Sequence, residues 1–444
     1  MAKMTSAGFP LFGLSTTGGE QGEYVIVCGG GGSSKTGIKN GLILMKWGKE
    51  KGKQEEVEEV AKVELSGMAP TNVALGKDDP LSIYCGVEEN CIQFIYTPKK
   101  DDDNIQEQHK FQTDFTPTNK DKPDQLPEQR ICKIFDKERL FTGGFDGCVR
   151  VWSISSSPPS LQKELFHPSF EPSKESEQTY NKKIAICDFD LCPSPSSSFS
   201  SSLSPSLLSV CYDDGKLRLF DLEKKEILHQ FNPFVKDYCF RSCRFSVSND
   251  EVVMFTGERK HRSPSFLSKW YISGTKQIKK EKKEEKEEKE KQKIQPLSTI
   301  LSNSLSNLLF LLTFTPSHLS PSRSLSPFSL LASRKVHKSF LTTITTCPHS
   351  NNNNKDLVLT AAADGSISSF FQDDLYPDVV LPNAHTFPVT GLGECEKGLL
   401  LSCSADHCYA VHVVGERPRK VDKMLVVLVS VLVLLLAFVI SFIL

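Results

Sequence analysis

The stretch LFTGGFDGCVRVW, residues 140–152, carries the pattern on which the fold assignment is built. An apolar start is followed by small residues and then by Asp146-Gly147. In the second half Val149 and Val151 alternate with polar or charged positions, and the stretch ends in an aromatic residue. Asp-Gly between two alternating segments is a strong signal for a tight turn joining antiparallel strands. The stretch therefore predicts a β-hairpin with Asp146-Gly147 at its tip.

Six other stretches repeat this pattern with varying fidelity. They are residues 24–47, 83–94, 210–220, 254–270, 359–370 and 401–413. Seven units at intervals of about 40 to 70 residues, apart from one long insertion, suit a WD-repeat propeller better than a solenoid. We therefore predict an all-β fold, a seven-bladed WD-repeat β-propeller over residues 1–415, followed by a C-terminal transmembrane helix. Tandem β-sandwiches are the alternative, which the recurring turn before an aromatic-ended strand disfavours.

Composition limits the classes of function. The chain has 444 residues, 39% hydrophobic and 24% charged, and its formal net charge is -1, which excludes a mostly disordered or fibrous protein. The neutral balance offers no electrostatic case for binding nucleic acid. The 14 cysteines include no Cys-x-x-Cys pair, which predicts reduced thiols rather than a zinc site. No secretory signal is evident at the N-terminus, so the bulk of the chain is expected in the cytosol.

Three stretches interrupt the repeats. Residues 276–333 predict a poorly structured insertion, because the first half is a run of Lys and Glu and the second half is rich in Ser, Leu and Pro. Residues 99–122 are alternately acidic and basic, and residues 194–209 are nearly all Ser, Pro and Leu. We expect both of these to be exposed loops.

The C-terminal segment MLVVLVSVLVLLLAFVISFIL, from Met424 to Leu444, contains no charged residue. As a helix it would span about 31 Å, enough for a bilayer core. Residues 416–423 form a basic juxtamembrane segment with Arg417, Arg419, Lys420 and Lys423. By the positive-inside rule this places the preceding domain in the cytosol. We predict a single-pass tail anchor, and its length suits the thinner membrane of the endoplasmic reticulum (ER).

A glycine-rich stretch, CGGGGSSKTGIKNG at residues 28–41, lies within the first repeat. It nearly spells a phosphate-binding P-loop, but Ser34 stands where the second glycine belongs, and Gly37 and Asn40-Gly41 would break the helix that a P-loop requires. A flexible hairpin is a second interpretation, although the stretch has more glycines than one turn needs. A functional loop is the third.

The third interpretation draws on a resemblance. FPLFGL at residues 9–14 and VCGGGGSSKTGIKNGL at residues 27–42 resemble the start of the family of the prolactin regulatory element-binding protein. QTDF at 112–115, GGFDGCVRVW at 143–152 and AHTFPVTG at 384–391 extend the similarity over most of the chain. Members of this family are WD-repeat proteins anchored in the ER membrane that act as guanine nucleotide exchange factors for the Sar GTPase. The insertion at 276–333 and the Ser-rich stretch depart from the family pattern.

The resemblance implies that the chain promotes GDP release from a Sar-type small GTPase and so starts coat protein complex II (COPII) vesicle assembly and ER-to-Golgi transport. It also implies a loop that binds a potassium ion and contacts the GTPase. The residues implied for the potassium loop are Gly29, Gly30, Gly31, Gly32, Gly37 and Asn40. Those implied for GTPase contact and exchange are Lys35, Ile38, Lys39 and Asn40. Consecutive glycines suit the cation because their carbonyls can turn toward one ion. We expect Ile38 to be exposed at the loop tip, where an apolar side chain needs a partner surface.

Three alternatives remain beside this interpretation. A non-catalytic scaffold for membrane-protein trafficking is the first, because many propellers only bind partners. A transcription factor is disfavoured because no helix-turn-helix, zinc or basic-region motif is present, and we expect no nucleic-acid partner. A hydrolase would rest on His385 and Asp406, but no nucleophile elbow accompanies them, and we expect His385 to be a structural hydrogen-bonding residue. The exchange factor itself breaks no covalent bond, so the chain is expected not to be an enzyme.

Overall fold

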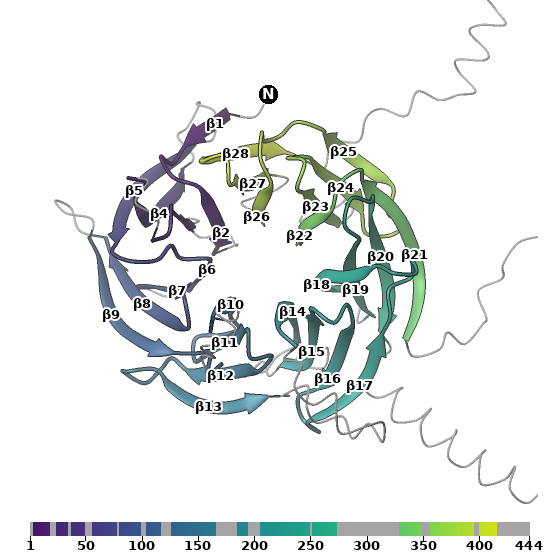
Figure 1. The fold of residues 1–444 in the computed structure, drawn as a ribbon, viewed down its shortest axis with the longest axis horizontal. Helices are drawn as coiled ribbons and strands as arrows, with labels where there is room; N and C mark the ends of the chain where they lie inside the picture. Colours follow the sequence, from purple (N-terminus) through teal and green to yellow (C-terminus); the bar gives the residue numbers. More distant parts are fainter. Residues whose placement is uncertain are drawn as a thin grey trace, which may run out of the picture.

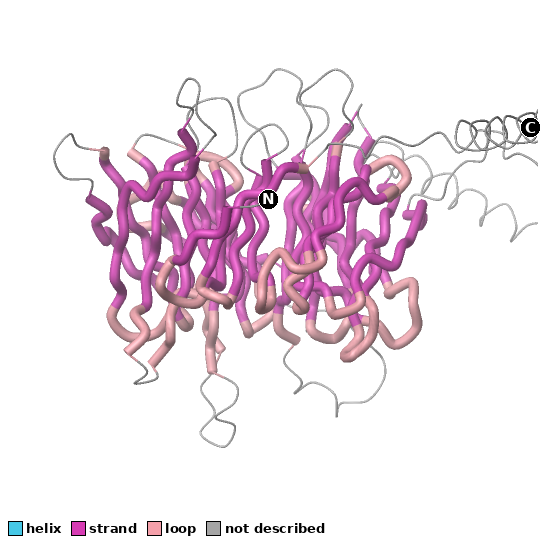
Figure 2. The backbone as a smooth tube through the Cα atoms, turned by 90° about the horizontal axis from the view of Figure 1, so that it is seen from above, coloured by secondary structure: helices cyan, strands magenta, loops and turns pink. Residues whose placement is uncertain are grey.

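The fold is a closed ring of seven four-stranded antiparallel sheets, the blades of a β-propeller (Figure 1). The computed structural model describes residues 3–17, 24–33, 37–48, 56–77, 80–98, 104–116, 126–165, 184–193, 205–248, 251–272, 328–347, 356–394 and 399–414. The strands run between two sets of loops that form the two faces of the ring (Figure 2). The prediction of an all-β, seven-bladed propeller is confirmed.

The first four blades follow one another along the chain, and in each the strands are ordered from innermost to outermost. Blade 1 has β2 (Leu11–Thr16), β3 (Tyr24–Gly29), β4 (Asn40–Gly48) and β5 (Glu56–Leu65). Blade 2 has β6 (Asn72–Leu75), β7 (Leu81–Val87), β8 (Asn90–Thr97) and β9 (Asn104–Gln112). Blade 3 has β10 (Gln129–Ile134), β11 (Arg139–Gly144), β12 (Val149–Ser153) and β13 (Ser160–Leu165). Blade 4 has β14 (Ile186–Pro193), β15 (Pro205–Tyr212), β16 (Leu217–Asp221) and β17 (Glu226–Phe231).

The remaining blades complete the ring. Blade 5 has β18 (Cys239–Ser248), β19 (Glu251–Arg259), β20 (Ser265–Ile272) and β21 (Phe328–His337). Blade 6 has β22 (Leu341–Cys347), β23 (Leu357–Ala362), β24 (Ile367–Phe371) and β25 (Pro377–Leu381). Blade 7 has β26 (Val389–Glu394), β27 (Leu399–Ser404), β28 (Cys408–Val413) and, outermost, β1 (Lys3–Ser6). Blade 7 is therefore built from two segments at opposite ends of the described chain.

The seven predicted hairpins are the two middle strands of the seven blades. Their turns show why aspartate recurs in four of them. The Asp146 carboxylate accepts the N–H of Cys148 at 3.0 Å, and the same bond two residues onward occurs at Asp214, Asp364 and Asp406. The residue after these aspartates, Gly147, Gly215, Gly365 or His407, has a φ of 78°, 85°, 78° or 69°. The side-chain bond closes the turn, and glycine adopts that φ without strain.

The hydrophobic core is divided among the interfaces between neighbouring blades. One cluster joins blades 1 and 2 through residues such as Ile26, Leu44 and Phe94, and another joins blades 4 and 5. Polar contacts join innermost strands near the centre, where Lys133 pairs with Asp190 at 2.7 Å and Arg244 with the carboxylate of Asp188 at 2.6 Å. Each blade thus depends on both of its neighbours.

The cysteines agree with the prediction of reduced thiols. All 13 cysteines in the described residues are free, and most are buried. Burial raises the pKa of the Cys192 and Cys403 thiols to about 12, so these groups stay protonated near neutral pH. They behave as small core residues.

Three boundaries drawn from composition need correction. Residues 328–333 of the predicted insertion belong to β21, and residues 104–112 of a predicted loop form β9. Residues 205–209 of the Ser-rich stretch begin β15, in which Leu207 and Leu208 are buried. Two of these strands, β9 and β21, are outermost in their blades, where one side faces solvent and polar residues are tolerated. Composition alone could not separate them from loops.

Other predicted segments lie outside the described residues. These are residues 276–327 of the insertion, the basic segment 416–423 and the anchor from Met424 to Leu444. Among the residues that are described, no helix is long and apolar enough to cross a membrane.

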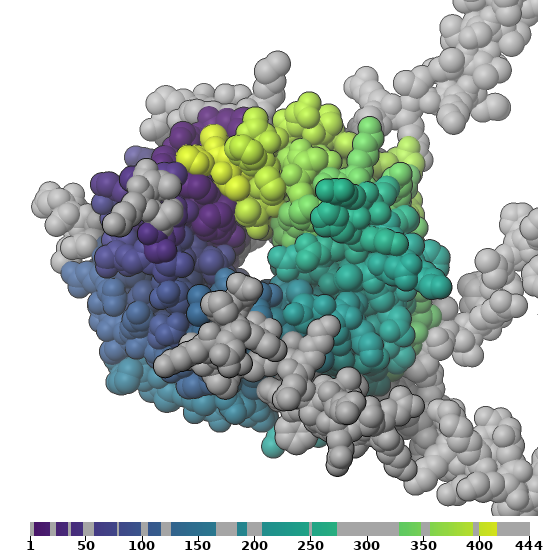
Figure 3. Space-filling model, viewed as in Figure 1, coloured from purple at the N-terminus to yellow at the C-terminus, as the bar shows by residue number. Residues whose placement is uncertain are grey.

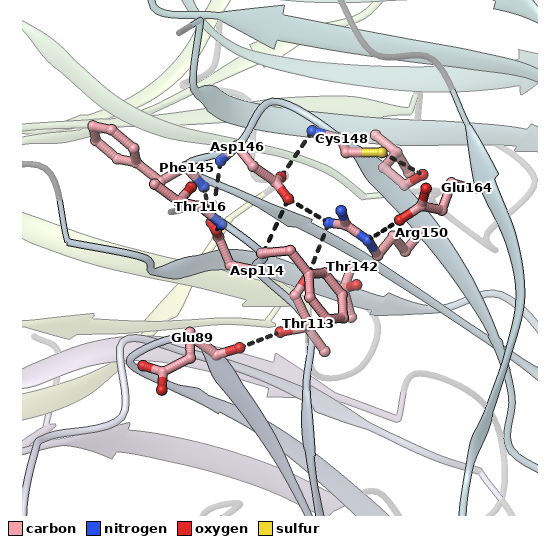
Figure 4. A network of polar contacts seen from close by, with 12 residues as sticks. Glu89, Thr113, Asp114, Thr116, Thr142, Phe145, Asp146, Cys148, Arg150 and Glu164 are labelled. Atoms are coloured by element: carbon pink, nitrogen blue, oxygen red, sulfur yellow. Dashed lines mark hydrogen bonds and ion pairs between the residues drawn. The ribbon is translucent and has the colours of Figure 1, made fainter. Parts of the chain in front are cut away.

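Asp114 of the QTDF stretch fastens blade 2 to the central hairpin of blade 3 (Figure 4). Its carboxylate is fully buried and accepts the backbone N–H groups of Thr116 at 2.7 Å, Asp146 at 3.1 Å and Phe145. Beside it, Arg150 pairs with Asp146 at 2.7 Å and donates to the Thr113 carbonyl at 2.9 Å. The connection between the blades is therefore held by a charged network.

Asp114→Ala is expected to destabilise the propeller by about 2–4 kcal/mol, because the buried N–H groups of Thr116 and Asp146 lose their acceptor, while the Phe145 N–H keeps the Glu128 carbonyl at 3.0 Å. Asp136→Ala is the matched control, since it removes a partly exposed ion pair with Arg139 and an exposed bond from the Glu138 N–H, and should cost about 1 kcal/mol. Thermal unfolding followed by tryptophan fluorescence measures both. Equal, small shifts in Tm for the two variants would contradict the assignment.

Candidate functional site

One face of the ring carries both the turns of the central hairpins and the starts of the innermost strands. In blade 1 the Gly30 N–H donates to the Pro10 carbonyl at 2.9 Å, and in blade 6 the Ala363 N–H donates to the Phe340 carbonyl at 3.0 Å. The same type of bond occurs in blades 3, 4 and 7. We call this side the turn face. The glycine-rich loop, which joins β3 to β4, lies on it.

Close backbone packing explains the first glycines of this loop. A Cβ on Gly29 would lie 1.9 Å from the Pro10 carbonyl oxygen, and one on Gly30 would lie 2.2 Å from the Asn40 side-chain oxygen. Gly30 also has a φ of 147°, which L side chains rarely adopt. Gly29 and Gly30 are therefore required for the loop to leave β3 at all. By contrast, Gly32 and Gly37 have positive φ but open space around them.

Asn40 braces the loop. Its side-chain oxygen accepts the Gly32 N–H at 2.9 Å, and its amide nitrogen donates to the carbonyls of Gly32 at 3.2 Å and Gly67 at 2.5 Å. The side chain is buried, with 6% of its surface exposed. One amide group thus ties both backbone groups of Gly32 to the connection after β5. The described start of the loop, residues 30–33, is therefore held in a defined conformation.

The other predicted contact residues differ in their surroundings. Lys39 is exposed and pairs with Glu64 at 2.6 Å. Ile38 is half-buried and packs against the apolar cluster between blades 1 and 7, so the expectation that it is exposed at the loop tip is wrong. Ile38 can pack against this cluster because β4 begins only two residues later, at Asn40. Lys35 lies outside the described residues.

The fit of a cation to this loop is partial. Both polar atoms of Asn40 are already engaged with Gly32 and Gly67, so Asn40 shapes the loop instead of offering a free oxygen. Backbone carbonyls of the glycine run are the donors of the right chemistry, since hard cations prefer oxygen ligands. No group of three His, Cys, Asp or Glu side chains suited to a metal occurs within the described ranges.

Exposed aromatic residues on the turn face are a feature that the repeat pattern does not predict. Phe115, Phe234 and Phe387 have exposed fractions of 47%, 59% and 59%. Each lies in a connection that leads into an innermost strand, in blades 3, 5 and 7. The sequence holds a weak signal for them, because each stands among polar or proline residues outside the repeats. Aromatic side chains exposed on one face are typical of protein-binding surfaces.

His385 and Asp406 form a buried polar chain in blade 7. The His385 Nδ1 lies 3.0 Å from an Asp406 carboxylate oxygen, its Nε2 lies 2.8 Å from the Ser402 hydroxyl, and that hydroxyl lies 2.7 Å from Nε2 of His412. The order Asp, His, Ser superficially matches a catalytic triad. Ser402 is fully buried, however, and does not line the cavity enclosed by the innermost strands. The prediction that His385 is a structural hydrogen-bonding residue is confirmed, and His412 is an additional member.

A similar arrangement joins blades 5 and 6. His337 contacts the hydroxyls of Ser366 at 2.7 Å and Thr360 at 2.8 Å. Burial lowers the pKa of His337 and of His412 to about 4, and it also lowers the pKa of His385 despite the Asp406 carboxylate. All three imidazoles are therefore neutral at physiological pH.

The architecture defines the chain as a WD-like, seven-bladed β-propeller with a braced glycine-rich loop on its turn face. No protein-family model matches the chain, and no curated protein matches it either. The fold and the loop geometry are thus the basis for inferring a function.

Asn40→Ala is expected to release the loop, because it removes three hydrogen bonds. Amide exchange at Gly32 should accelerate by about tenfold or more, corresponding to a loss of roughly 1–2 kcal/mol. Hydrogen exchange with mass spectrometry of a peptide covering residues 28–33 measures this. Lys39→Ala, which removes only an exposed ion pair, is the control and should leave exchange at Gly32 unchanged.

Stability is expected to fall as the pH drops from about 6.5 to about 4. In that window an unfolded histidine binds a proton that folded His337 and His412 do not, so acid favours the unfolded state by up to roughly 3 kcal/mol per histidine. His412→Gln should lower Tm at pH 7 and flatten its dependence on pH. His261→Gln, at an exposed turn, is the control. An unchanged pH slope in His412→Gln would overturn the linkage.

Proposed function

We propose that this chain is a guanine nucleotide exchange factor for a Sar-type small GTPase, working at the ER membrane to start coat protein complex II vesicle assembly and ER-to-Golgi transport. The observation that carries the proposal is the braced glycine-rich loop on the turn face. It is the stretch in which the sequence resembles the exchange-factor family most specifically, and Asn40 holds its described start in place through Gly32.

The turn face also carries exposed side chains that suit a protein partner. Phe115, Phe234 and Phe387 are exposed there, and Lys39 is exposed beside the loop. Apolar rings supply binding energy when a partner removes them from water, while a charge at the rim favours encounter with an opposite charge. A GTPase seated on this face would meet the loop and the rings together. Because Ile38 is half-buried, its contact with the GTPase is limited to the part that remains exposed.

The mechanism requires no covalent chemistry from the propeller. The factor stabilises the nucleotide-free GTPase relative to its GDP-bound form, so that GDP leaves and GTP takes its place. A thousandfold acceleration corresponds to a barrier lower by about 4 kcal/mol. A loop already ordered by Asn40 loses less conformational entropy on binding than a free loop would. The brace therefore contributes directly to the proposed activity.

Potassium remains part of the proposal, with Asn40 positioning the ligands of the ion instead of being one of them. Carbonyl oxygens of Gly29, Gly30, Gly31, Gly32 and Gly37 would hold the ion, and Asn40 would position them. When bound, a cation of this kind supplies further ordering of the loop.

A non-catalytic scaffold is the second candidate. The specific observation that favours it is the set of exposed phenylalanines, because they are spread over blades 3, 5 and 7 and serve protein binding without any exchange activity. In both proposals the segment from Met424 to Leu444 anchors the propeller in the ER membrane.

The test is GDP release from purified Sar GTPase, followed with a fluorescent nucleotide and full-length protein in detergent micelles. Wild type should accelerate release, and Asn40→Ala should lose at least about tenfold of that acceleration. Asn90→Ala, at the start of β8 as Asn40 is at the start of β4, is the matched control and should keep full activity. Replacing potassium by sodium should reduce the wild-type rate. If folded wild-type protein binds the GTPase without accelerating release, the scaffold function replaces this one.

A further inference from the structure

The innermost strands share a feature that the sequence does not reveal. In six of the seven blades the pairing with the second strand slips by one residue near the start of the innermost strand. Such a β-bulge leaves one residue unpaired and re-aims its side chain. The six bulged residues are Phe12, Arg130, Cys187, Arg241, Thr342 and Thr390. We call them the collar.

All six collar residues line one cavity. It is the central channel of the ring, with a volume of about 510 Å³, and innermost strands from all seven blades line it. Figure 3 shows its opening at the centre of the ring. Because the bulges lie at the strand starts, the collar surrounds the channel at the turn face. The volume falls in the range of small-molecule binding sites.

Two guanidinium groups of the collar flank Cys187. Arg241 donates from Nη1 to the Cys187 carbonyl at 2.9 Å. Burial raises the pKa of the Cys187 thiol; the positive charges of Arg241, Arg130 and Arg259 oppose that rise, and the negative charge of Asp213 adds to it. Arg259 and Arg241 also repel each other, because burial and then Arg241 lower the pKa of Arg259. Like charges are thus gathered at one point of the collar.

Nearby carboxylates offset this cluster only in part. Asp188 is held by Arg244 and Asp190 by Lys133, while Asp213, whose charge also acts on Cys187, accepts the Ala185 N–H at 3.0 Å. Arg130 has Glu128 at 3.5 Å, a half-exposed contact that contributes little. Within the described residues no ion pair is formed by Arg241 or Arg259.

A polar group in the collar also lacks a partner. The Thr342 hydroxyl is buried and makes no hydrogen bond to any described group. A buried hydroxyl without a partner costs about 1–3 kcal/mol, so a ligand oxygen placed there would stabilise the fold. Arginine forks match phosphate oxygens in geometry and charge. The collar therefore offers N–H and O–H donors to an anion.

We propose that the collar binds a small phosphate compound carrying at least two phosphoryl groups, seated over Cys187 between Arg130 and Arg241 with Thr342 within reach. A compact ligand is favoured over a folded partner because the site lies inside a channel enclosed by the blades. This site is separate from the glycine-rich loop, and it does not rest on the proposed exchange activity.

The test is isothermal titration calorimetry of full-length protein in detergent with sodium pyrophosphate and with inorganic phosphate. Pyrophosphate should bind more tightly than phosphate, and Arg130→Gln and Arg241→Gln should each weaken it by about tenfold or more. Arg262→Gln removes an exposed charge on the same face and is the control, with an effect below about twofold. Equal weakening in Arg262→Gln and Arg241→Gln would show only a general positive field and overturn the site.

A second readout does not depend on binding heat. Pyrophosphate should slow the alkylation of Cys187 by iodoacetamide several-fold, measured by peptide mass spectrometry, while half-buried Cys408 in blade 7 serves as the internal reference. Absence of both heat and protection in folded wild-type protein would refute the proposal. A phosphoserine peptide that binds more tightly than pyrophosphate would also refute it, because the site would then serve a phosphorylated protein.

Discussion

Closure of the ring is the constraint on which the other features depend. A single four-stranded blade exposes two apolar faces, and only a closed ring covers both faces of every blade. Closure is made by β1, which pairs with β28 from Lys3↔Val411 to Ser6↔Cys408. The cluster behind this seam includes Phe9, Leu11 and Leu401, all almost fully buried. Because each such side chain is worth about 1.5–3 kcal/mol when buried, an open seam would forfeit much of the net stability.

The sequence predicts the fold well because the central hairpins carry a local cause. Turns such as Asp146-Gly147 are closed by the aspartate itself and by a residue with positive φ, and both requirements are visible as residue types. The outermost strands have no comparable residues that fix their structure locally. Strands β9 and β21 are specified by pairing with a neighbour across the blade, so their polar sequences resemble loops. The same reasoning explains the misplaced boundaries of the predicted insertion.

The candidate site could be predicted only in part. The glycine-rich loop is visible in the sequence, and Gly29 and Gly30 are explained by close packing against Pro10 and Asn40. The partners of Asn40 include Gly67, which lies 27 residues further along the chain, after β5, and no residue pattern links the two. The half-buried position of Ile38 likewise depends on a cluster shared with blade 7. The collar could not be foreseen, since a β-bulge is defined by register and not by residue type.

The pairing of β1 with β28 also sets an order in time. About 400 residues separate the two strands, so at roughly 5–20 residues per second the ribosome finishes β28 some 20–80 s after β1 has been made. Until then β1 has no partner strand, and six blades wait as an open arc with apolar faces at both ends. Every chain in synthesis therefore passes through a stage in which it can pair with the arc of another chain. Variation in β1 is therefore expected to change the cellular yield of the protein as well as the stability of the finished ring.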